Sequence, residues 1–519
     1  MNIAFHIGRL IIGVHAGLAC FLITLPSLAS HQNTRLEDYV GKHGAAILQE
    51  YSALLSIPNL ASDAPNIRRN AEAIVAMFGR RGVEARLLEE EGAPPLVFGE
   101  LRSPGAGRTV IFYAHYDGQP VDAARWQSDP WTPVLRDGRL EDGAKTVDVA
   151  DVKSDGAHDY RIYARSSSDD KAPIMALAAA LDFLKAEKTP LSVNVIFLFE
   201  GEEEAGSPHL PEFLSKYKNL LQADALFICD GPVDQSGRMQ LVFGARGTMG
   251  LEMTVYGPDH PLHSGHYGNW APNPVALLSS LLAGMRDDDG KILIDGIYED
   301  VRPVTEKEKR AILKMPDIDD GLRKEYGLAR TEADGARLAE RILLPALNIR
   351  GIRGGAVGSQ AVNAIPSEAS ASIDFRLVPD QSPAKIRELV EVHIKKKGFT
   401  ILRRDPDRRE RLQHPKLIQL EWEDGYPPYR LPLDDPFGQA VARAVAGALP
   451  EPPLSLPSLG GSVPMKMFAD ALGIPVLGLP IVNHDNNQHG PNENLRLRNL
   501  WEGIAMFAGL MANLGDHWK

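Results

Sequence analysis

The side chains of this sequence that are best suited to chemistry follow directly after four apolar runs. Histidine, aspartate and glutamate predominate among them, and these residue types supply nitrogen and oxygen ligands to divalent metal ions. If the runs are strands of one open α/β sheet, their carboxyl ends bring these side chains to the edge where such sheets bind ligands. The runs are Thr109–Ala114, followed by His115 and Asp117; Val193–Phe199, followed by Glu200 and Glu202–Glu204; Ala225–Cys229, followed by Asp230; and Pro475–Leu479, followed by His484, Asp485 and His489.

Two acidic segments favour a metal site at this edge. Glu202–Glu204 stand directly after a run that must be buried, and adjacent carboxylates repel one another unless a cation lies among them. Asp169 and Asp170 precede an Ala- and Leu-rich stretch, Lys171–Glu187. Taken singly, the first segment is also consistent with a solvated acidic face and the second with a helix N-cap, where Asp is favoured. The joint pattern indicates a metal site more strongly than any of its parts.

The elements that would position these side chains alternate as in an α/β domain. The four apolar runs are short and bounded by polar or turn residues, which is typical of strands in a mostly parallel sheet covered by helices. Apolar residues at three- and four-residue spacing predict helices over Tyr39–Leu55, Asn66–Gly79 and Lys171–Glu187. We therefore expect a catalytic domain formed by residues 31–245 and 429–519.

The middle of the chain, residues 246–428, has a different pattern and predicts an inserted α+β domain. Its expected order is β-α-β-β-α-β with an antiparallel sheet. The charged residues 286–345 are helical in pattern and would elaborate this domain. The expected elements are strands at Thr248–Tyr256, Ala346–Ile352, Ala369–Leu377 and Phe399–Arg403, with helices at Asn273–Met285 and Ser382–Lys397.

The first 29 residues have the pattern of a secretory signal peptide. Arg9 precedes a mostly apolar stretch, Leu10–Leu25, and small residues before Ala29 suit cleavage there. We expect an exported protein, periplasmic or secreted, without stable membrane insertion after cleavage; the alternative is an uncleaved anchor. The net charge of −12 argues against nucleic acid as a partner.

Nine motifs, in order along the chain, resemble those of the co-catalytic di-zinc metallopeptidases. This family includes carnosinase-type dipeptidases, dipeptidase V, aminoacylase and carboxypeptidase G. The resemblance covers the chain from about residue 40 to its end. The motifs are His115-Tyr116-Asp117, Ser168-Asp169-Asp170-Lys171, Glu200 to Ser207, Asp230, His263-Ser264-Gly265, Asn363 to Pro366, Phe375 to Pro379, Gly460-Gly461-Ser462, and His489 to Glu493.

The resemblance implies two divalent metal ions per chain, Zn²⁺ before Mn²⁺ or Co²⁺. It implies that His115 and Asp230 bind one ion, that Glu204 and His489 bind the other, and that Asp169 bridges both across a cis Asp169–Asp170 peptide. It also implies that Glu203 is the general base and that Asp117 orients the His115 ring. The sequence departs from the family pattern at two positions. Ala172 stands where the family usually has Gly after Asp-Asp-Lys, and Arg165-Ser166 stands where many members have Arg-Gly.

The resemblance also implies how substrate is held. Arg376 and the loop Gly460-Gly461-Ser462 would bind the substrate carboxylate, with Asn363 as a further substrate-binding residue. His263 would stabilise the oxyanion in the partner subunit's active site, which requires a homodimer formed through the inserted domain and closure of that domain as a lid. An alternative interpretation of His263 is a loop residue with a hydroxyl cap.

The function that these patterns predict is hydrolysis of dipeptides or similar short peptides by a water that bridges the two metal ions. Asp at position 230 favours a dipeptidase, because family members with Glu there tend to be carboxypeptidases or deacylases. The alternatives are an N-acyl-amino-acid amidohydrolase or a carboxypeptidase on the same site, and a non-catalytic peptide-binding relative. The sequence lacks the motifs Gly-x-Ser-x-Gly, Gly-x-Gly-x-x-Gly, Walker A and His-Glu-x-x-His.

Overall fold

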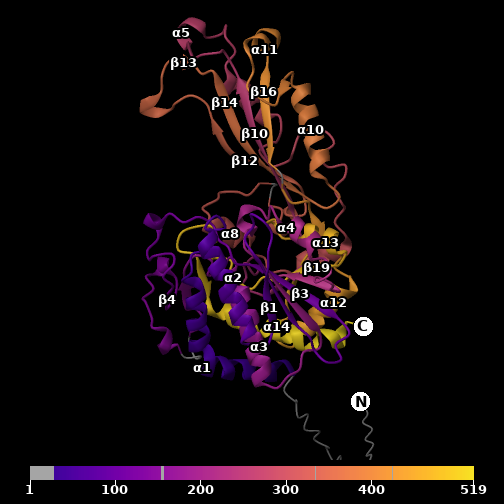
Figure 1. Cartoon of the computed structure of the whole chain (residues 1–519). Helices are drawn as coiled ribbons and strands as arrows, with labels where there is room; N and C mark the ends of the chain where they lie inside the picture. Colours follow the sequence, from indigo (N-terminus) through magenta and orange to yellow (C-terminus); the bar gives the residue numbers. More distant parts are fainter. Residues whose placement is uncertain (1–27, 153–156, 333–334, 424, 519) are drawn as a thin grey trace, which may run out of the picture.

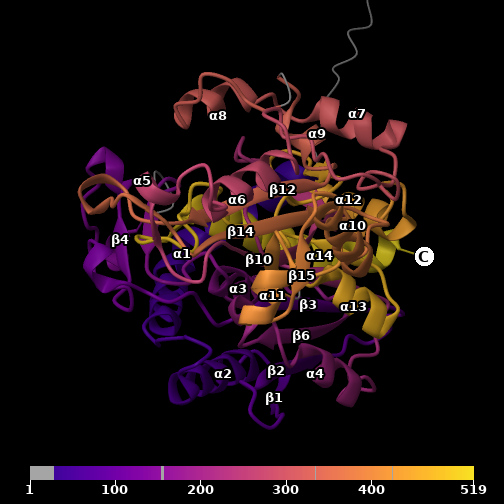
Figure 2. The ribbon, with the colours of Figure 1, turned by 90° about the horizontal axis from the view of Figure 1, so that it is seen from above.

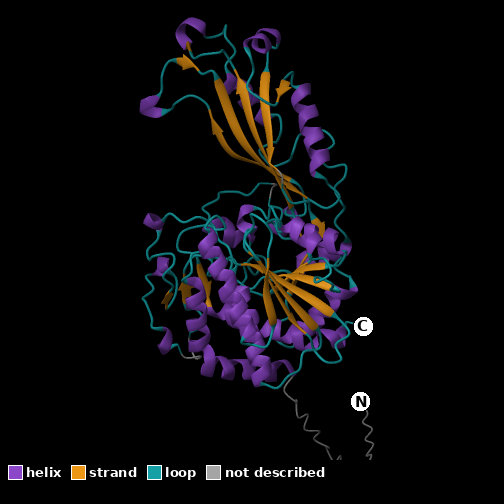
Figure 3. Cartoon of the chain, viewed as in Figure 1, coloured by secondary structure: helices purple, strands orange, loops and turns teal. Residues whose placement is uncertain are grey.

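The structure is a computed structural model that describes residues 28–152, 157–332, 335–423 and 425–518, with the side chains of the first helix described from Arg35 onward. The predicted signal peptide, residues 1–29, therefore lies outside the described residues except for two backbone positions. Within the described part, no helix is long and apolar enough to cross a membrane. The chain forms two parts, one above the other, each with its own sheet (Figures 1 and 3). The lower layer corresponds to the expected catalytic domain and the upper layer to the expected inserted domain.

The lower layer is built on an eight-stranded sheet whose centre is parallel. Strands β6, β3, β7 and β19 run parallel to one another, whereas β1 and β2 join antiparallel at one edge and β8 pairs antiparallel with β19 near the other. This confirms the predicted mostly parallel sheet. In spatial order the strands are β1 (Glu84–Leu88), β2 (Leu96–Leu101), β6 (Asn194–Glu200), β3 (Thr109–His115), β7 (Ala225–Ile228), β19 (Val476–Gly478), β8 (Gln240–Val242) and β18 (Leu454–Leu456).

Helices cover both faces of this sheet because its central strands carry apolar side chains on both faces. Phe112 of β3 belongs to the core under one set of helices, and its neighbours Ile111 and Tyr113 belong to the core under the other. The first set consists of α1 (Leu28–Leu55), α2 (Ala64–Gly79), α3 (Lys171–Ala186), α12 (Pro436–Ala446) and α14 (Leu497–His517); the second consists of α4 (Leu210–Lys216) and α13 (Met465–Leu472).

The upper layer is a five-stranded sheet with a separate core formed by residues between Met249 and Leu420. Helices α6 (Pro274–Ala283) and α10 (Pro383–Lys396) pack on the apolar face of the sheet. The helices and four of the strands lie where we expect them, which confirms the α+β class of the insertion. The spatial order is β12 (Ala346–Arg353), β14 (Glu368–Leu377), β10 (Gly247–Tyr256), β16 (Leu417–Glu423) and β15 (Thr400–Leu402).

The fifth strand, β16, corrects the predicted topology of the inserted domain. It enters the sheet between β10 and β15, pairing antiparallel with β10 and parallel with β15. The strand expected over Phe399–Arg403 is thus not the last, and the sheet is not wholly antiparallel. Leu417, Ile418 and Leu420 are buried, whereas Glu421 and Glu423 are exposed. The strand is therefore held in the sheet by the apolar residues of its first half, which pack into the core.

The other elements are short. Helices α7 (Glu306–Lys314), α8 (Asp319–Glu325) and α9 (Leu338–Arg341) lie together along one flank, as the view from above shows (Figure 2). The far tip of the inserted domain carries α5 (Ser264–Tyr267), α11 (Arg408–Gln413) and the pair β11 (Leu262–His263) and β13 (Ala364–Ile365). Two small sheets complete the lower layer: β4 (Val134–Arg136), β5 (Arg161–Tyr163) and β20 (Asn494–Arg496), and β9 (Gly244–Ala245) with β17 (Tyr429–Arg430).

Candidate metal centre

The carboxyl ends of β3, β6 and β7 bring the predicted metal-binding side chains of the catalytic domain together. His115 is the last residue of β3 and Asp230 follows β7 closely, while Glu203 and Glu204 follow β6 in a single 3₁₀ turn. Among the described residues, His115, Asp169 and Glu204 offer ligand atoms that all lie within 4.8 Å of one another. His115, Asp170 and Asp230 form a second such group. Asp170 was not predicted as a ligand from the sequence.

Asp169 lies between the two histidines of the centre. Its Oδ1 is 3.1 Å from His115 Nε2, and its Oδ2 is 3.0 Å from His489 Nε2. His489 Nε2 also lies 3.3 Å from Glu204 Oε2. The peptide that joins Asp169 to Asp170 is cis, as the family resemblance implies. The two oxygens of one carboxylate therefore face two different histidines.

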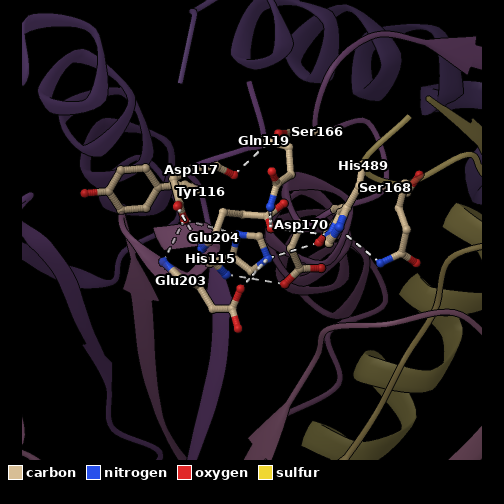
Figure 4. A network of polar contacts seen from close by, with 12 residues as sticks. His115, Tyr116, Asp117, Gln119, Ser166, Ser168, Asp170, Glu203, Glu204 and His489 are labelled. Atoms are coloured by element: carbon tan, nitrogen blue, oxygen red, sulfur yellow. Dashed lines mark hydrogen bonds and ion pairs between the residues drawn. The ribbon is translucent and has the colours of Figure 1, made fainter. Parts of the chain in front are cut away.

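Asp117 supports both His115 and the acidic turn. Its Oδ1 lies 3.2 Å from His115 Nδ1, and its two oxygens accept hydrogen bonds from the backbone N–H groups of Glu203 and Glu204, at 3.1 and 3.0 Å. Figure 4 shows these contacts between the end of β3 and the turn after β6. Asp117 thus holds two side chains of the centre in a fixed relation to each other.

Glu493 holds the segment that carries Asp169, a role that the sequence analysis did not assign. This fully buried carboxylate accepts hydrogen bonds from the backbone N–H groups of Ser166, Ser168 and Asp169 and from Arg165 Nη1, at 2.7–3.0 Å. The only signal in the sequence was its place in the stretch from His489 to Glu493.

Two glutamines, also missed from the sequence, contact carboxylates of the candidate metal centre. Gln119 Nε2 donates a hydrogen bond to Glu204 Oε2 at 2.7 Å, and Gln488 Nε2 donates one to Asp169 Oδ2 at 3.2 Å. By contrast, Asp485, a further acidic residue noted near His489, has other partners. Its Oδ2 pairs with Arg161 Nη2 at 2.6 Å.

The electrostatics of the centre favour a bound cation. Burial, and then repulsion from Asp169, raise the pKa of Glu204 to about 8 and that of Asp230 to about 6. Burial likewise raises the pKa of Glu203 well above its usual range. The hydrogen bond with Asp169 raises the pKa of His489 to about 9. Crowded carboxylates beside two histidines match the oxygen and nitrogen donor set of divalent ions, and such an ion would offset the repulsion.

The predicted carboxylate-binding residues also meet, at the junction of the two layers. Arg376 of β14 donates from Nη1 to Ser462 Oγ at 3.0 Å and from Nε to Asp374 at 3.0 Å. Arg246, which the sequence analysis missed, donates from Nε to the Gly460 carbonyl at 3.0 Å. The loop Gly460–Ser462 of the catalytic domain is therefore contacted by an arginine of the inserted sheet.

His263 and Asn363 lie elsewhere, at the far tip of the inserted domain. His263 caps α5, where its Nδ1 accepts a hydrogen bond from Gly265 N at 3.1 Å, and Ser264 N donates to the Asn363 carbonyl at 2.8 Å. Figure 1 places α5 and β13 at the end of the upper layer that points away from the catalytic sheet. Within one chain, neither residue reaches the metal centre.

The fold and the site together define a metal-dependent hydrolase of the α/β class. Residues 111–513 match the sequence model of peptidase family M20/M25/M40, and the chain belongs to this family. The predicted family and the prediction of a metallopeptidase are thereby confirmed, and so is the use of divalent metal.

Relatives with known names cover most of the chain. This chain is 30% identical over 430 residues to the Cys-Gly metallodipeptidase DUG1 of Saccharomyces cerevisiae, and the aligned part covers 80% of this chain and 82% of the yeast protein. It is 28% identical to the human Beta-Ala-His dipeptidase, covering 82% and 78%. Among solved structures, the M20 family metallo-carboxypeptidase Sso-CP2 from Sulfolobus solfataricus superposes with a TM-score of 0.74 at 28% identity, covering 91% of this chain and 99% of that one.

Proposed function

We propose that this protein hydrolyses dipeptides with two divalent ions, most simply Zn²⁺, held at the candidate metal centre. The observation that carries the proposal is the position of Asp169, whose two oxygens lie 3.1 and 3.0 Å from ring nitrogens of His115 and His489. A carboxylate between two histidines suits a pair of ions that share it. His115 and Asp230 would complete one site, with Asp170 beside them, and Glu204 and His489 would complete the other.

The ions would supply Lewis-acid activation of the attacking water and of the amide carbonyl. The proton transfers belong to Glu203, whose Oε2 lies 4.0 Å from His115 Nε2 at the edge of the centre. Glu203 would take a proton from the attacking water and deliver it to the leaving amine. Asp117 accepts a hydrogen bond from the backbone N–H of Glu203 and so fixes the backbone from which its side chain projects.

The substrate class follows from the residues beside the centre. Arg376 offers a planar fork of N–H donors next to Ser462, Gly460 and Gly461, which suits the free carboxylate of a short peptide. The names of two relatives, a Cys-Gly metallodipeptidase and a Beta-Ala-His dipeptidase, support a dipeptide. The likeness to a metallo-carboxypeptidase favours a second candidate, removal of C-terminal residues from longer peptides or, by the same chemistry, deacylation of N-acyl amino acids.

A homodimer would bring His263 and Asn363 to the metal centre of the partner subunit. Both residues lie at the tip of the inserted domain. The five-stranded sheet of that domain ends in the edge strand β12, most of whose residues are exposed. Trp270, Val357 and Val362 near this tip are 78%, 85% and 72% exposed, so apolar surface is available there for a second copy of the chain. The inserted domain would then pair across a two-fold axis and act as a lid.

We also propose that residues 1–29 direct export and are removed after Ala29. The support is the charge and hydropathy pattern of this segment alone. Amino-terminal sequencing of the protein from its native host tests this, and a mature chain that still begins at Met1 would contradict it.

Metal analysis combined with a substrate panel tests the main proposal. Purified protein is expected to hold two divalent ions per chain and to hydrolyse dipeptides faster than N-acyl amino acids or longer peptides. Chelation should abolish hydrolysis and lower the unfolding temperature, and re-added zinc should restore both, because the ions bind the folded state. A fully active sample with a single ion, or a preference for N-acyl amino acids, would overturn the dinuclear or the dipeptidase assignment, respectively.

A further inference from the structure

Arg246 lies against the loop Gly460–Ser462, although the sequence did not predict it as a site residue. It stands between β9 and β10, where the chain passes from the catalytic domain into the inserted domain. Its Nε donates a hydrogen bond to the Gly460 carbonyl at 3.0 Å, and its Nη2 lies 3.7 Å from the position that a Cβ on Gly460 would occupy. Arg246 therefore contacts the loop that we propose to hold the substrate carboxylate.

This loop also borders a cavity of about 370 Å³ that reaches the candidate metal centre. Asp230, Ile342 and Gly460–Ser462 all line the cavity. Ile342 Cδ1 lies 3.3 Å from the same Cβ position on Gly460, so Ile342 and Arg246 flank one side of that glycine. The side chains of Arg246 and Ser462 are only partly buried. A small anion seated on the loop can therefore be reached by Arg246 from the inserted domain.

The positive charge of Arg376 is already matched by a carboxylate, whereas that of Arg246 is not. Arg376 Nε donates to Asp374 Oδ2 at 3.0 Å. Asp374 has little capacity left, because Oδ2 also accepts from Asn348 Nδ2 and Oδ1 accepts from Thr248 Oγ1, both at 3.2 Å. In the part of the chain that the structure describes, no carboxylate forms an ion pair with Arg246, and its hydrogen-bond partner is a neutral carbonyl.

The two arginines are close enough to repel each other. Thr248, two residues after Arg246, pairs with Arg376 in the register of β10 and β14. Burial, and then the charge of Arg376, lower the pKa of Arg246 to about 10, so both guanidinium groups stay protonated at neutral pH. Two cations that share one carboxylate leave one positive charge in excess, and a bound anion would relieve the repulsion.

We infer that Arg246 is a second substrate-binding arginine, which supplies the positive charge that attracts the C-terminal carboxylate of the substrate. Arg376 and Ser462 would then act mainly through the direction of their hydrogen bonds, because Asp374 neutralises Arg376. The site would select substrates with a free C-terminal carboxylate over the matching carboxamides. The inference rests on the proposed function, since it assumes that this carboxylate is held at Gly460–Ser462.

A pair of substrates that differ only in this charge tests the inference. Ala-Leu and Ala-Leu amide are compared by kcat and KM, and by Kd from calorimetry on the metal-loaded Glu203→Gln protein. Arg246→Gln removes the charge but keeps an N–H donor for the Gly460 carbonyl. We expect it to raise KM and Kd for Ala-Leu by roughly 10- to 100-fold, mostly without loss of kcat, and to reduce the preference over the amide by the same factor. Arg246→Lys should recover part of this preference.

A matched control and two outcomes decide the role of Arg246. Arg403→Gln alters an exposed arginine after β15 that pairs with Glu391, and it should keep the parent preference. An unchanged preference in Arg246→Gln, or an equal loss with both substrates, would show that Arg246 only holds the loop and would overturn the inference.

Failure of the proposed function gives a different result. A protein that hydrolyses no dipeptide would refute the dipeptidase assignment. The same comparison, made by Kd with N-acetyl-leucine and N-acetyl-leucine amide, would then decide the inference, and lack of binding of either free carboxylate would overturn it.

Discussion

Glu202 and Glu203 are neighbours in the sequence, but their side chains have different surroundings. Glu202 Oε2 lies 2.9 Å from His209 Nδ1, and Glu202 also accepts the backbone N–H of His209, whereas Glu203 faces the metal centre. We expect Glu203→Gln to lower kcat by roughly 10²- to 10⁴-fold with both ions retained, because glutamine cannot accept the proton. Glu202→Gln is the matched control and should remain active. The reverse result would shift the general base by one residue.

Glu493 is the residue whose loss should disturb the centre without touching a metal ion. Its carboxylate is fully buried, and its partners are three backbone N–H groups and Arg165. Glu493→Gln removes the charge and leaves Arg165 uncompensated, which should lower the free energy of unfolding by about 3 kcal/mol and weaken metal binding. Urea unfolding and metal titration measure the two effects. Unchanged metal affinity would contradict the role given to Glu493.

Sequence reasoning predicted the side chains that gather at the candidate metal centre, because most of them follow apolar strands. His115 and Asp230 needed only the strand ends, while the identity of His489 among its neighbours needed the family resemblance. Glu493, Gln119 and Gln488 could not be found in this way, since their roles depend on contacts between segments far apart in the chain.

At the scale of elements, helix α7 is fixed to the catalytic domain by a buried ion pair. Glu308 Oε1 lies 3.1 Å from Arg430 Nε of β17, and both side chains are at most 5% exposed. Glu308→Ala should lower the free energy of unfolding by about 3–5 kcal/mol, because Arg430 is left as an unpaired buried charge. Glu306→Ala, on an exposed position of the same helix, should leave the urea midpoint near that of the wild type. Equal midpoints for both variants would show that the pair does not hold α7.

Strand β16 shows where element prediction failed and why. Its residues Leu417–Glu423 do alternate toward the end, with Leu420 and Trp422 separated by an exposed glutamate. The stretch is short and follows the strongly charged segment Arg403–Lys416, so its pattern does not stand out in the sequence. The strands at the centre of the eight-stranded sheet were predictable because burial on both faces makes them continuously apolar. Those at the centre of the inserted sheet were predictable because their burial alternates along the strand.

At the scale of the whole molecule, the position of His263 predicts complementation between subunits. His263→Ala alone should bind metal normally and lose roughly 10²- to 10³-fold in rate. Glu203→Gln alone is also expected to be nearly inactive. After subunit exchange, one site of each mixed dimer has both an intact base and an intact partner histidine. An equal mixture should therefore regain about a quarter of wild-type activity. Proven mixed dimers without recovery would contradict a role for His263 across the interface.

The distance of the tip helix α5 from the catalytic sheet has a consequence for how this protein would behave on dilution (Figure 1). A catalyst whose site is completed by a second copy obeys the law of mass action, so its specific activity is not constant. We expect turnover per chain to fall as the protein is diluted below the dissociation constant of the dimer, with half of the activity lost near that concentration. Assays over a dilution series would then measure the dissociation constant of the dimer directly. Constant activity per chain down to picomolar protein would contradict this expectation if gel filtration at the same concentrations shows monomers. If gel filtration still shows dimers there, the dimer is extremely tight.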